Sequence, residues 1–174
     1  MQGVRIIYAT RLIAAAPLDT RLPRAAQSQA ARALLDRITA GTHMAFSKSH
    51  SRTAVAVAAS HNAGVSVGID IEWMAPERPF TTVALGYLGT AAAGVAVSDF
   101  YRAWTFYEAF FKAFQRPPAP AAIEETLSSS ARSVCQLRDG TRVIQHCVAD
   151  GFQLSLVWSG GDCVPVYLGE RVCD

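Results

Sequence analysis

Lysine is scarce in this sequence of 174 residues, in which Lys48 and Lys112 stand against 14 arginines. The formal net charge is only +2, and this near-neutral balance argues against a general nucleic-acid-binding protein. A compact ammonium group differs chemically from the planar guanidinium fork of arginine. Biased codon usage also produces such a scarcity. The scarcity therefore makes the two lysines candidates for a functional role but does not establish one.

Closely spaced cysteine pairs and long apolar runs are also missing. The four cysteines include no C-x-x-C pair, which argues against a zinc site. No apolar run approaches the roughly 20 residues of a membrane span, and residues 4–9 are too few for the core of a signal peptide. We therefore expect a cytoplasmic protein with free thiols.

The apolar content of 51% is sufficient for a globular core that needs neither metal nor disulfide support. Alternating β-branched and aromatic residues predict strands, and apolar residues at helical spacing predict helices. The predicted strands cover residues 4–9, 44–48, 53–60, 66–73, 134–137, 141–148 and 152–158, and the predicted helices cover 24–38, 81–97 and 100–115. Asp99 is the expected N-cap of the last helix, and a proline-rich loop is expected over 116–122.

The order of these elements recurs in the two halves of the chain, although no sequence repeat is present. It predicts an α+β fold built from two pseudo-duplicated lobes, residues 1–76 and 77–174. Each lobe is expected to hold a helix packed on a small three-stranded antiparallel sheet.

Two acidic residues share one face of the strand predicted over 66–73. Side chains alternate along a strand, so Asp70 and Glu72 lie on the same side, about 7 Å apart. Gly68 shares their face, and the apolar residues between them point into a core. Hard oxygen ligands of this kind suit Mg²⁺ or Mn²⁺. The alternative is a half-exposed strand with a polar outer face.

The helix predicted over 100–115 is aromatic nearly all round, which is typical of a buried helix. Glu108 and Lys112 lie one turn apart on one face, with Trp104 a turn earlier. A surface ion pair at this spacing contributes only about 0.3–0.5 kcal/mol. In so apolar a helix we favour the polar wall of a cleft, because a buried carboxylate needs a compensating cation.

A third group of polar residues surrounds Ser49-His50-Ser51 at the end of a predicted strand. Lys48 and Arg52 flank these residues, and hydroxyls, cationic side chains and turn N–H groups together form an anion cradle. The arginines of the segment 24–38 are expected on a solvated helix face, with phosphate contact as the alternative.

The order of these motifs resembles that of the 4′-phosphopantetheinyl transferases, most closely the two-lobed type that serves peptide and polyketide synthases. The resemblance covers residues 44–115. It is carried by Phe46-Ser47-Lys48-Ser49-His50-Ser51, by Val67-Gly68-Ile69-Asp70-Ile71-Glu72, and by Trp104, Glu108-Ala109 and Lys112. It implies an enzyme formed by a single domain of 174 residues, with the active site between the lobes.

The resemblance also implies a reaction: 4′-phosphopantetheine passes from coenzyme A to a serine of a carrier protein, and adenosine 3′,5′-bisphosphate is released. Glu108 would accept the serine proton, and Lys112 would neutralise charge on the bridging and leaving oxygens. The implied ligands of Mg²⁺ or Mn²⁺ are Asp70, Glu72 and Glu108, and the implied CoA-binding residues are Lys48, Ser49, His50 and Lys112.

The partners implied are coenzyme A and an acyl or peptidyl carrier protein. Binding to nucleic acid or to a membrane is not expected, and the chain is expected to be a monomer. The carrier is expected to dock near the segment 81–97, where Leu85, Tyr87 and Leu88 offer apolar anchors beside Arg78; filling of the local core is the alternative.

The chain departs from the family pattern at Tyr107, where a lysine is usual, and at residues 115–118, where a glycine-containing turn is usual. A non-catalytic relative that binds CoA or a carrier protein is therefore one alternative. A metal-dependent phosphohydrolase or nuclease is the other, although the commonest such nucleases carry their Glu and Lys two residues apart on a strand.

Overall fold

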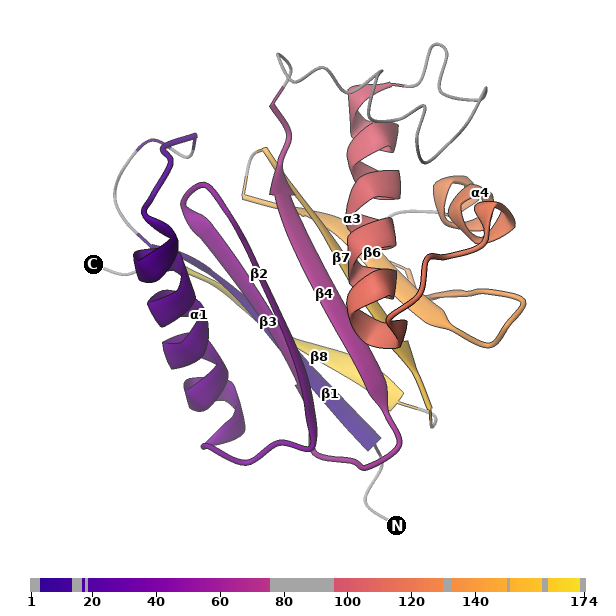
Figure 1. Ribbon diagram of the computed structural model, residues 1–174, viewed down its shortest axis with the longest axis horizontal. Helices are drawn as coiled ribbons and strands as arrows, with labels where there is room; N and C mark the ends of the chain where they lie inside the picture. The colour runs from indigo at the N-terminus through magenta and orange to yellow at the C-terminus, as the bar shows by residue number, and fades with distance from the viewer. Residues whose placement is uncertain are drawn as a thin grey trace.

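A computed structural model describes residues 4–13, 17, 19–75, 96–129, 133–149, 151–160 and 163–172 of the chain (Figure 1). This part has the predicted mixed α+β character. Its helices are α1 (Arg24–Thr39), α3 (Val97–Phe114) and α4 (Pro120–Ser128). Its strands are β1 (Val4–Leu12), β2 (Ala45–Ser51), β3 (Ala54–Ser60), β4 (Ser66–Trp73), β5 (Cys135–Gln136), β6 (Arg142–Val148), β7 (Phe152–Ser159) and β8 (Cys163–Val172).

The strands form two four-stranded sheets, sheet A with the order β2-β3-β1-β8 and sheet B with the order β4-β7-β6-β5. One apolar core holds side chains of both sheets, for example Ile6 from sheet A and Ile69 from sheet B. Helix α1 packs on sheet A through Leu34, and α3 packs on sheet B through Phe106 and Phe110. The two long helices consequently flank the neighbouring strands β2 and β4 (Figure 1).

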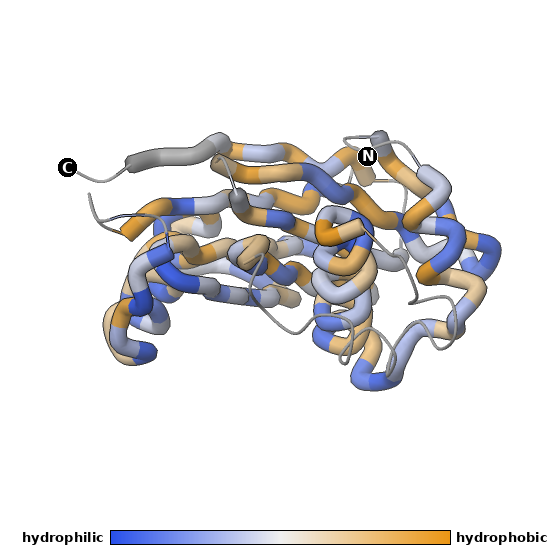
Figure 2. Tube along the Cα trace, turned by 90° about the horizontal axis from the view of Figure 1, so that it is seen from above, coloured by the Kyte–Doolittle hydropathy of each residue, from blue (hydrophilic) through white to orange (hydrophobic). Residues whose placement is uncertain are grey.

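The predicted alternation of side chains on β4 is confirmed. Val67, Ile69 and Ile71 enter the core shared by the sheets, whereas Gly68 lies against α3 and Asp70 lines a cavity. Orange and blue residues both occur along several strands in the view from above (Figure 2), as expected for strands whose successive side chains point to opposite faces. The strand thus separates a hydrophobic face from one that lines a cavity.

The expected division into one three-stranded antiparallel sheet per half is wrong, because the two halves exchange strands. β4 pairs with β7 of sheet B, with Asp70 opposite Ser155. β8 pairs with β1 of sheet A, and this pairing is parallel. The lobe boundary predicted after residue 76 therefore does not coincide with the division of the strands between the sheets.

The N-cap predicted for α3 is also wrong. The helix begins at Val97, its N-cap is Ala96, and no side chain caps it. Asp99 instead lies in the first turn, where a carboxylate interacts favourably with the helix dipole and where it contacts Arg102 at 3.5 Å. Most of the helix predicted over 81–97 lies outside the described residues.

The proline-rich segment 116–122 is only partly a loop, because α4 begins at Pro120. Proline is well tolerated at the first helical position, where its missing N–H would have no helical partner. Arg102 of α3 donates to the carbonyl oxygens of Thr126 at 2.7 Å and Ser129 at 2.9 Å. These bonds satisfy the carboxyl end of α4 and hold the helix beside α3.

Strand β4 and helix α3 approach each other most closely at Gly68. A Cβ atom at this position would overlap the backbone oxygen of Ala109 and would lie 2.8 Å from the backbone nitrogen of Ala113. The glycine is therefore required by the space available. Its lack of a side chain allows α3 to bring Glu108 and Lys112 beside the polar face of β4.

Candidate active site

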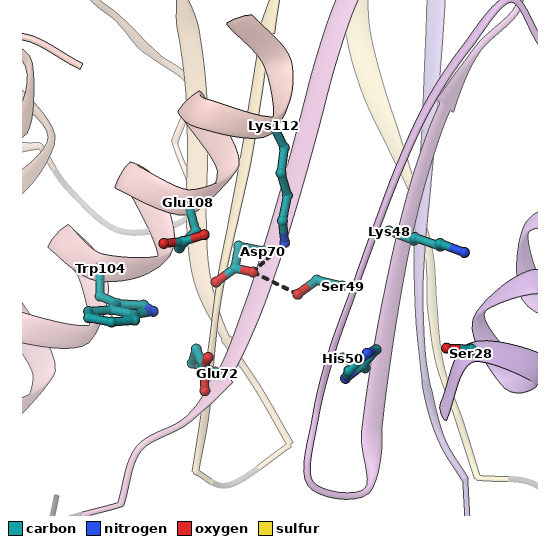
Figure 3. Close-up of a pocket in the computed structure, with 9 residues that line it drawn as sticks. All are labelled: Ser28, Lys48, Ser49, His50, Asp70, Glu72, Trp104, Glu108 and Lys112. Atoms are coloured by element: carbon teal, nitrogen blue, oxygen red, sulfur yellow. Dashed lines mark hydrogen bonds and ion pairs between the residues drawn. The ribbon is translucent and has the colours of Figure 1, made fainter. Parts of the chain in front are cut away.

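A cavity of about 440 Å³ takes its lining from α1, β2, β4 and α3. In Figure 3, Glu108 and Lys112 project from α3 toward Asp70, and Ser49, Lys48 and His50 lie across from Glu108 on the other side of Asp70. The lining residues are Ser28, Lys48, Ser49, His50, Asp70, Glu72, Trp104, Glu108 and Lys112. The structure thus brings together every residue that the sequence assigns to metal, coenzyme A or catalysis.

Asp70 is the most deeply buried acid of this cavity, with 4% of its surface exposed. Its Oδ1 accepts hydrogen bonds from Ser49 Oγ at 2.6 Å and Lys112 Nζ at 2.7 Å. Its Oδ2 is buried and has no hydrogen-bond partner. Burial raises the pKa of Asp70 above its ordinary value, although Lys112 and Ser49 act in the opposite direction. The free oxygen is therefore a place where a proton or a cation would be stabilising.

Glu108 and Glu72 add two further carboxylates to the same cavity. Burial, followed by the negative charge of Asp70, raises the pKa of Glu108, and Lys112 opposes the rise. Glu72 is half-buried, and its Oε2 accepts a hydrogen bond from Ser51 Oγ at 2.9 Å. A raised carboxyl pKa brings Glu108 closer to the range that suits a general base near neutral pH.

The donor chemistry of this cavity fits a hard divalent cation, because carboxylate oxygens are the ligands that Mg²⁺ and Mn²⁺ prefer. The buried free oxygen of Asp70 supports the same fit. Within the described ranges, however, no three His, Cys, Asp or Glu side chains already stand together as a metal-holding group. The joint ligation of one ion by Asp70, Glu72 and Glu108 stays a prediction.

The surroundings of His50 favour its neutral form. Burial, and then the positive charge of Lys112, lowers the pKa of His50 below its ordinary value of 6.5. A neutral imidazole can donate one hydrogen bond to an anion, and the approach of that anion favours uptake of a second proton. His50 is thus placed to take up a proton, and with it a positive charge, when a phosphate binds.

A second cavity of about 430 Å³ adjoins the first and shares His50 and Glu72 with it. Its other lining residues are Arg21, Leu22, Arg24, Gln27, Ser51 and Arg52. Gln27 Nε2 donates to the Arg52 carbonyl oxygen at 2.7 Å and so ties α1 to the β2–β3 turn. The guanidinium groups of this second cavity form a basic extension of the first. Arg52 was predicted as part of the anion cradle, whereas for Arg24 a solvated helix face was expected, with phosphate contact as the alternative.

Several sequence predictions fall outside the cavity. Tyr107, which replaces the usual lysine, packs against the apolar cluster between α3 and sheet B. The predicted docking residues Arg78, Leu85, Tyr87 and Leu88 lie outside the described residues. Ser28 lines the cavity but was not predicted as part of the site, because its position depends on the packing of α1 beside β2.

Comparison with known proteins adds no family to these observations: no family model matches the chain, and no curated protein matches it in sequence.

None of the helices in the part of the chain described here has the length and hydropathy needed to cross a membrane. Among the described cysteines, Cys135 and Cys147 are free thiols.

Proposed function

We propose that this chain transfers 4′-phosphopantetheine from coenzyme A to a serine hydroxyl of an acyl or peptidyl carrier protein. The serine oxygen forms a bond to the phosphorus that carries the pantetheine arm, the pyrophosphate P–O bond breaks, and adenosine 3′,5′-bisphosphate leaves. The observation that carries the proposal is the meeting of Asp70, Glu72, Glu108, Lys112 and His50 in one cavity. Their order along the chain is the order of the family motifs.

The roles of the individual residues follow from their surroundings. Glu108 has a raised pKa and lines the cavity, so we assign it the serine proton. Lys112 supplies positive charge next to Asp70, so we assign it the neutralisation of the negative charge that grows on the leaving oxygen. Phosphoryl transfer depends chiefly on positioning and charge neutralisation. A bound Mg²⁺ would supply further neutralisation of the pyrophosphate, held by Asp70, Glu72 and Glu108.

The basic second cavity supports a substrate with several phosphates. Arg21, Arg24 and Arg52 line it beside His50, and coenzyme A carries a 3′-phosphate as well as its pyrophosphate. Guanidinium groups bind phosphate through paired N–H donors. We assign this cavity to the adenosine end of coenzyme A.

Mass spectrometry of a carrier protein tests the proposal. After incubation with the chain, coenzyme A and Mg²⁺, the carrier should gain the mass of one phosphopantetheinyl group at its acceptor serine. Omitting Mg²⁺, or changing the acceptor serine to alanine, should prevent the gain. An unmodified carrier across several carrier types would contradict the proposed reaction, and calorimetric binding of coenzyme A without any modification would identify a non-catalytic binding protein.

Substitution of Lys112 should act mainly on turnover. Lys112→Ala should lower kcat by about a hundredfold, as loss of a preorganised electrostatic partner commonly does, and should raise the KM for coenzyme A much less. Lys112→Arg should recover activity only in part, because a planar fork cannot take the place of a point charge. Steady-state kinetics measure both effects.

Lys48→Ala is the matched control, because Lys48 is the other lysine of the cavity and lies on β2. This variant should raise KM while kcat changes little. A Lys112→Ala variant with parental kcat would reduce the residue to an ion-pair partner of Asp70.

Binding of the product should be accompanied by proton uptake at His50. The unliganded pKa of His50 is lowered, and a neighbouring phosphate raises it again, so binding near pH 6.5 should take up as much as about one proton. Calorimetry with adenosine 3′,5′-bisphosphate in two buffers of different ionisation enthalpy measures this number. The number of protons taken up should be smaller in the His50→Gln variant. An equal uptake by parent and variant would show that His50 does not contact the phosphate.

A further inference from the structure

Side-chain hydroxyls join the two sheets where β2 and β4 lie next to each other. The strands belong to different sheets, so their edges are not joined by a backbone ladder. Instead the Ile69 N–H donates to Ser47 Oγ at 3.0 Å, and the Trp73 N–H donates to Ser51 Oγ at 3.0 Å. Alternate residues of a strand point to the same side, and Ser47, Ser49 and Ser51 form one row directed at β4. We call this row the serine junction.

Two hydroxyls of the serine junction also reach the acids of the cavity. Ser49 Oγ donates to Asp70 Oδ1 at 2.6 Å, and Ser51 Oγ donates to Glu72 Oε2 at 2.9 Å. Ser51 thus uses its hydroxyl twice, since the oxygen accepts from the backbone of β4 while the hydrogen is directed at the carboxylate. The accepted bond fixes where the donated bond can point.

We propose that Ser51 and Ser49 are positioning residues that hold the carboxylates of Glu72 and Asp70 toward the cavity, where they can bind a divalent cation. The inference rests on the proposed function for the identity of that cation. A glutamate side chain has three rotatable bonds, and fixing them before binding removes that entropic cost from the binding step. Groups that orient metal ligands act in this way, and their loss commonly weakens metal affinity by about 10–100-fold.

This role differs from the contact with a CoA phosphate that the sequence implied for Ser49. The Ser49 hydroxyl is buried, with 8% of the residue exposed, and its hydrogen is engaged by Asp70. The position of Ser49 is therefore explained by the carboxylate that it contacts.

Binding of Mn²⁺ to the full chain, without coenzyme A, tests the proposal. Free Mn²⁺ is measured by electron paramagnetic resonance as the ion is titrated into the parent and each variant. Ser51→Ala should weaken Mn²⁺ binding by about tenfold or more, and Ser51→Thr, which retains the hydroxyl, should restore most of the affinity. Ser47→Ala is the matched control, because Ser47 accepts the same type of backbone N–H from β4 but, unlike Ser51, lines neither of the two cavities.

Urea unfolding separates positioning from stability. Ser47→Ala and Ser51→Ala each remove one hydroxyl that accepts a β4 N–H, so both should lower the free energy of unfolding, and Ser51→Ala also loses the bond to Glu72. Only Ser51→Ala should weaken Mn²⁺ binding. In a Glu72→Gln background the effect of Ser51→Ala on Mn²⁺ affinity should disappear, because the two residues act as one unit.

Equal Mn²⁺ affinities for the Ser47→Ala and Ser51→Ala variants would overturn the proposal, as would an undiminished effect of Ser51→Ala in the Glu72→Gln background. A parent chain that binds no Mn²⁺ would overturn it together with the metal assignment. A parent chain that binds Mn²⁺ but modifies no carrier protein would remove the proposed reaction and leave the positioning role standing.

Discussion

Replacing Asp70 with asparagine is expected to abolish the proposed phosphopantetheine transfer while leaving the fold intact. The amide retains an oxygen that can accept hydrogen bonds from Ser49 and Lys112, so the local packing is kept. The negative charge and the free oxygen for a cation are lost. Transfer should fall by more than about a hundredfold, since removal of even an outer partner of a metal ligand often costs 10–100-fold. Mass spectrometry of the carrier protein measures the loss.

The same variant should gain stability relative to the parent as pH rises. Because burial raises the pKa of Asp70, the folded chain binds this proton more tightly than the unfolded chain. The contribution of Asp70 to stability is therefore full below the ordinary pKa of 3.8 and is lost as pH rises through the raised value. Asparagine does not titrate, so the difference in unfolding free energy should shift in favour of Asp70→Asn from pH 4 upward.

Metal-free buffer containing a chelator is needed for these unfolding measurements, since a bound cation would compensate the charge. Asp36→Asn on the exposed side of α1 is the control and should leave transfer unchanged. Retention of Mg²⁺-dependent transfer by Asp70→Asn would show that Asp70 is not a metal ligand. A stability difference that does not depend on pH would show that its carboxyl titrates alike in the folded and unfolded chain.

Gly68→Ala should destabilise the fold strongly. Gly68 is the one glycine among the described residues without a positive φ, so the cost comes from lack of space and not from backbone conformation. The new Cβ would meet the backbone of α3 at Ala109 and Ala113, and backbone atoms cannot rotate away as a flexible side chain can. The free energy of unfolding should fall by about 3 kcal/mol, the upper end of the usual cost of overpacking. Urea denaturation measures this loss.

Displacement of α3 by Gly68→Ala should also weaken the site. Glu108 and Lys112 would move with the helix, so transfer should fall even at temperatures where the variant is folded. Gly41→Ala is the control: Gly41 has φ +79° and no atom within 4 Å of an added Cβ, so its cost is only the backbone strain of about 1 kcal/mol. Equal losses of stability for the two variants would show that α3 can shift away from β4 without cost.

The functional face of β4 was predictable because strand periodicity is local. An alternating run of apolar and polar residues predicts a strand over 66–73, which are the bounds of β4, and assigns Asp70 and Glu72 to one face. Helical spacing in the same way assigns Glu108 and Lys112 to one side of α3. These inferences need only the geometry of a single element.

The missed helix α4 shows where local signals are ambiguous. Pro117, Pro118 and Pro120 predict a loop when they are taken together, yet Pro120 lies at the start of a helix. The position of a proline relative to the helix start decides its effect, and sequence alone did not locate that start. The hydrogen bonds that hold the end of α4 are donated by Arg102 of α3, so the local sequence of α4 does not contain this signal.

The serine junction and the basic second cavity were not predictable because they depend on distant parts of the chain. Ser51 contacts Glu72 across 21 residues of sequence, and Gln27 holds the Arg52 carbonyl across 25. The sequence also does not determine which sheet β4 and β8 join. The alternation of apolar and polar side chains along each strand is compatible with pairing in either sheet. Tertiary packing, rather than local pattern, decides these contacts.

The parallel pairing of β1 with β8 has a consequence for synthesis on the ribosome. The hydroxyl of Thr10 on β1 meets the hydroxyl of Tyr167 on β8 at 2.7 Å, although 157 residues separate them. Translation proceeds at about 5–20 residues per second, so β1 emerges many seconds before its neighbour. During that interval one edge of β1 has no strand to bond, and long-range closure of this kind is slow. A nascent chain of this protein is therefore expected to depend on chaperones until β8 has been made.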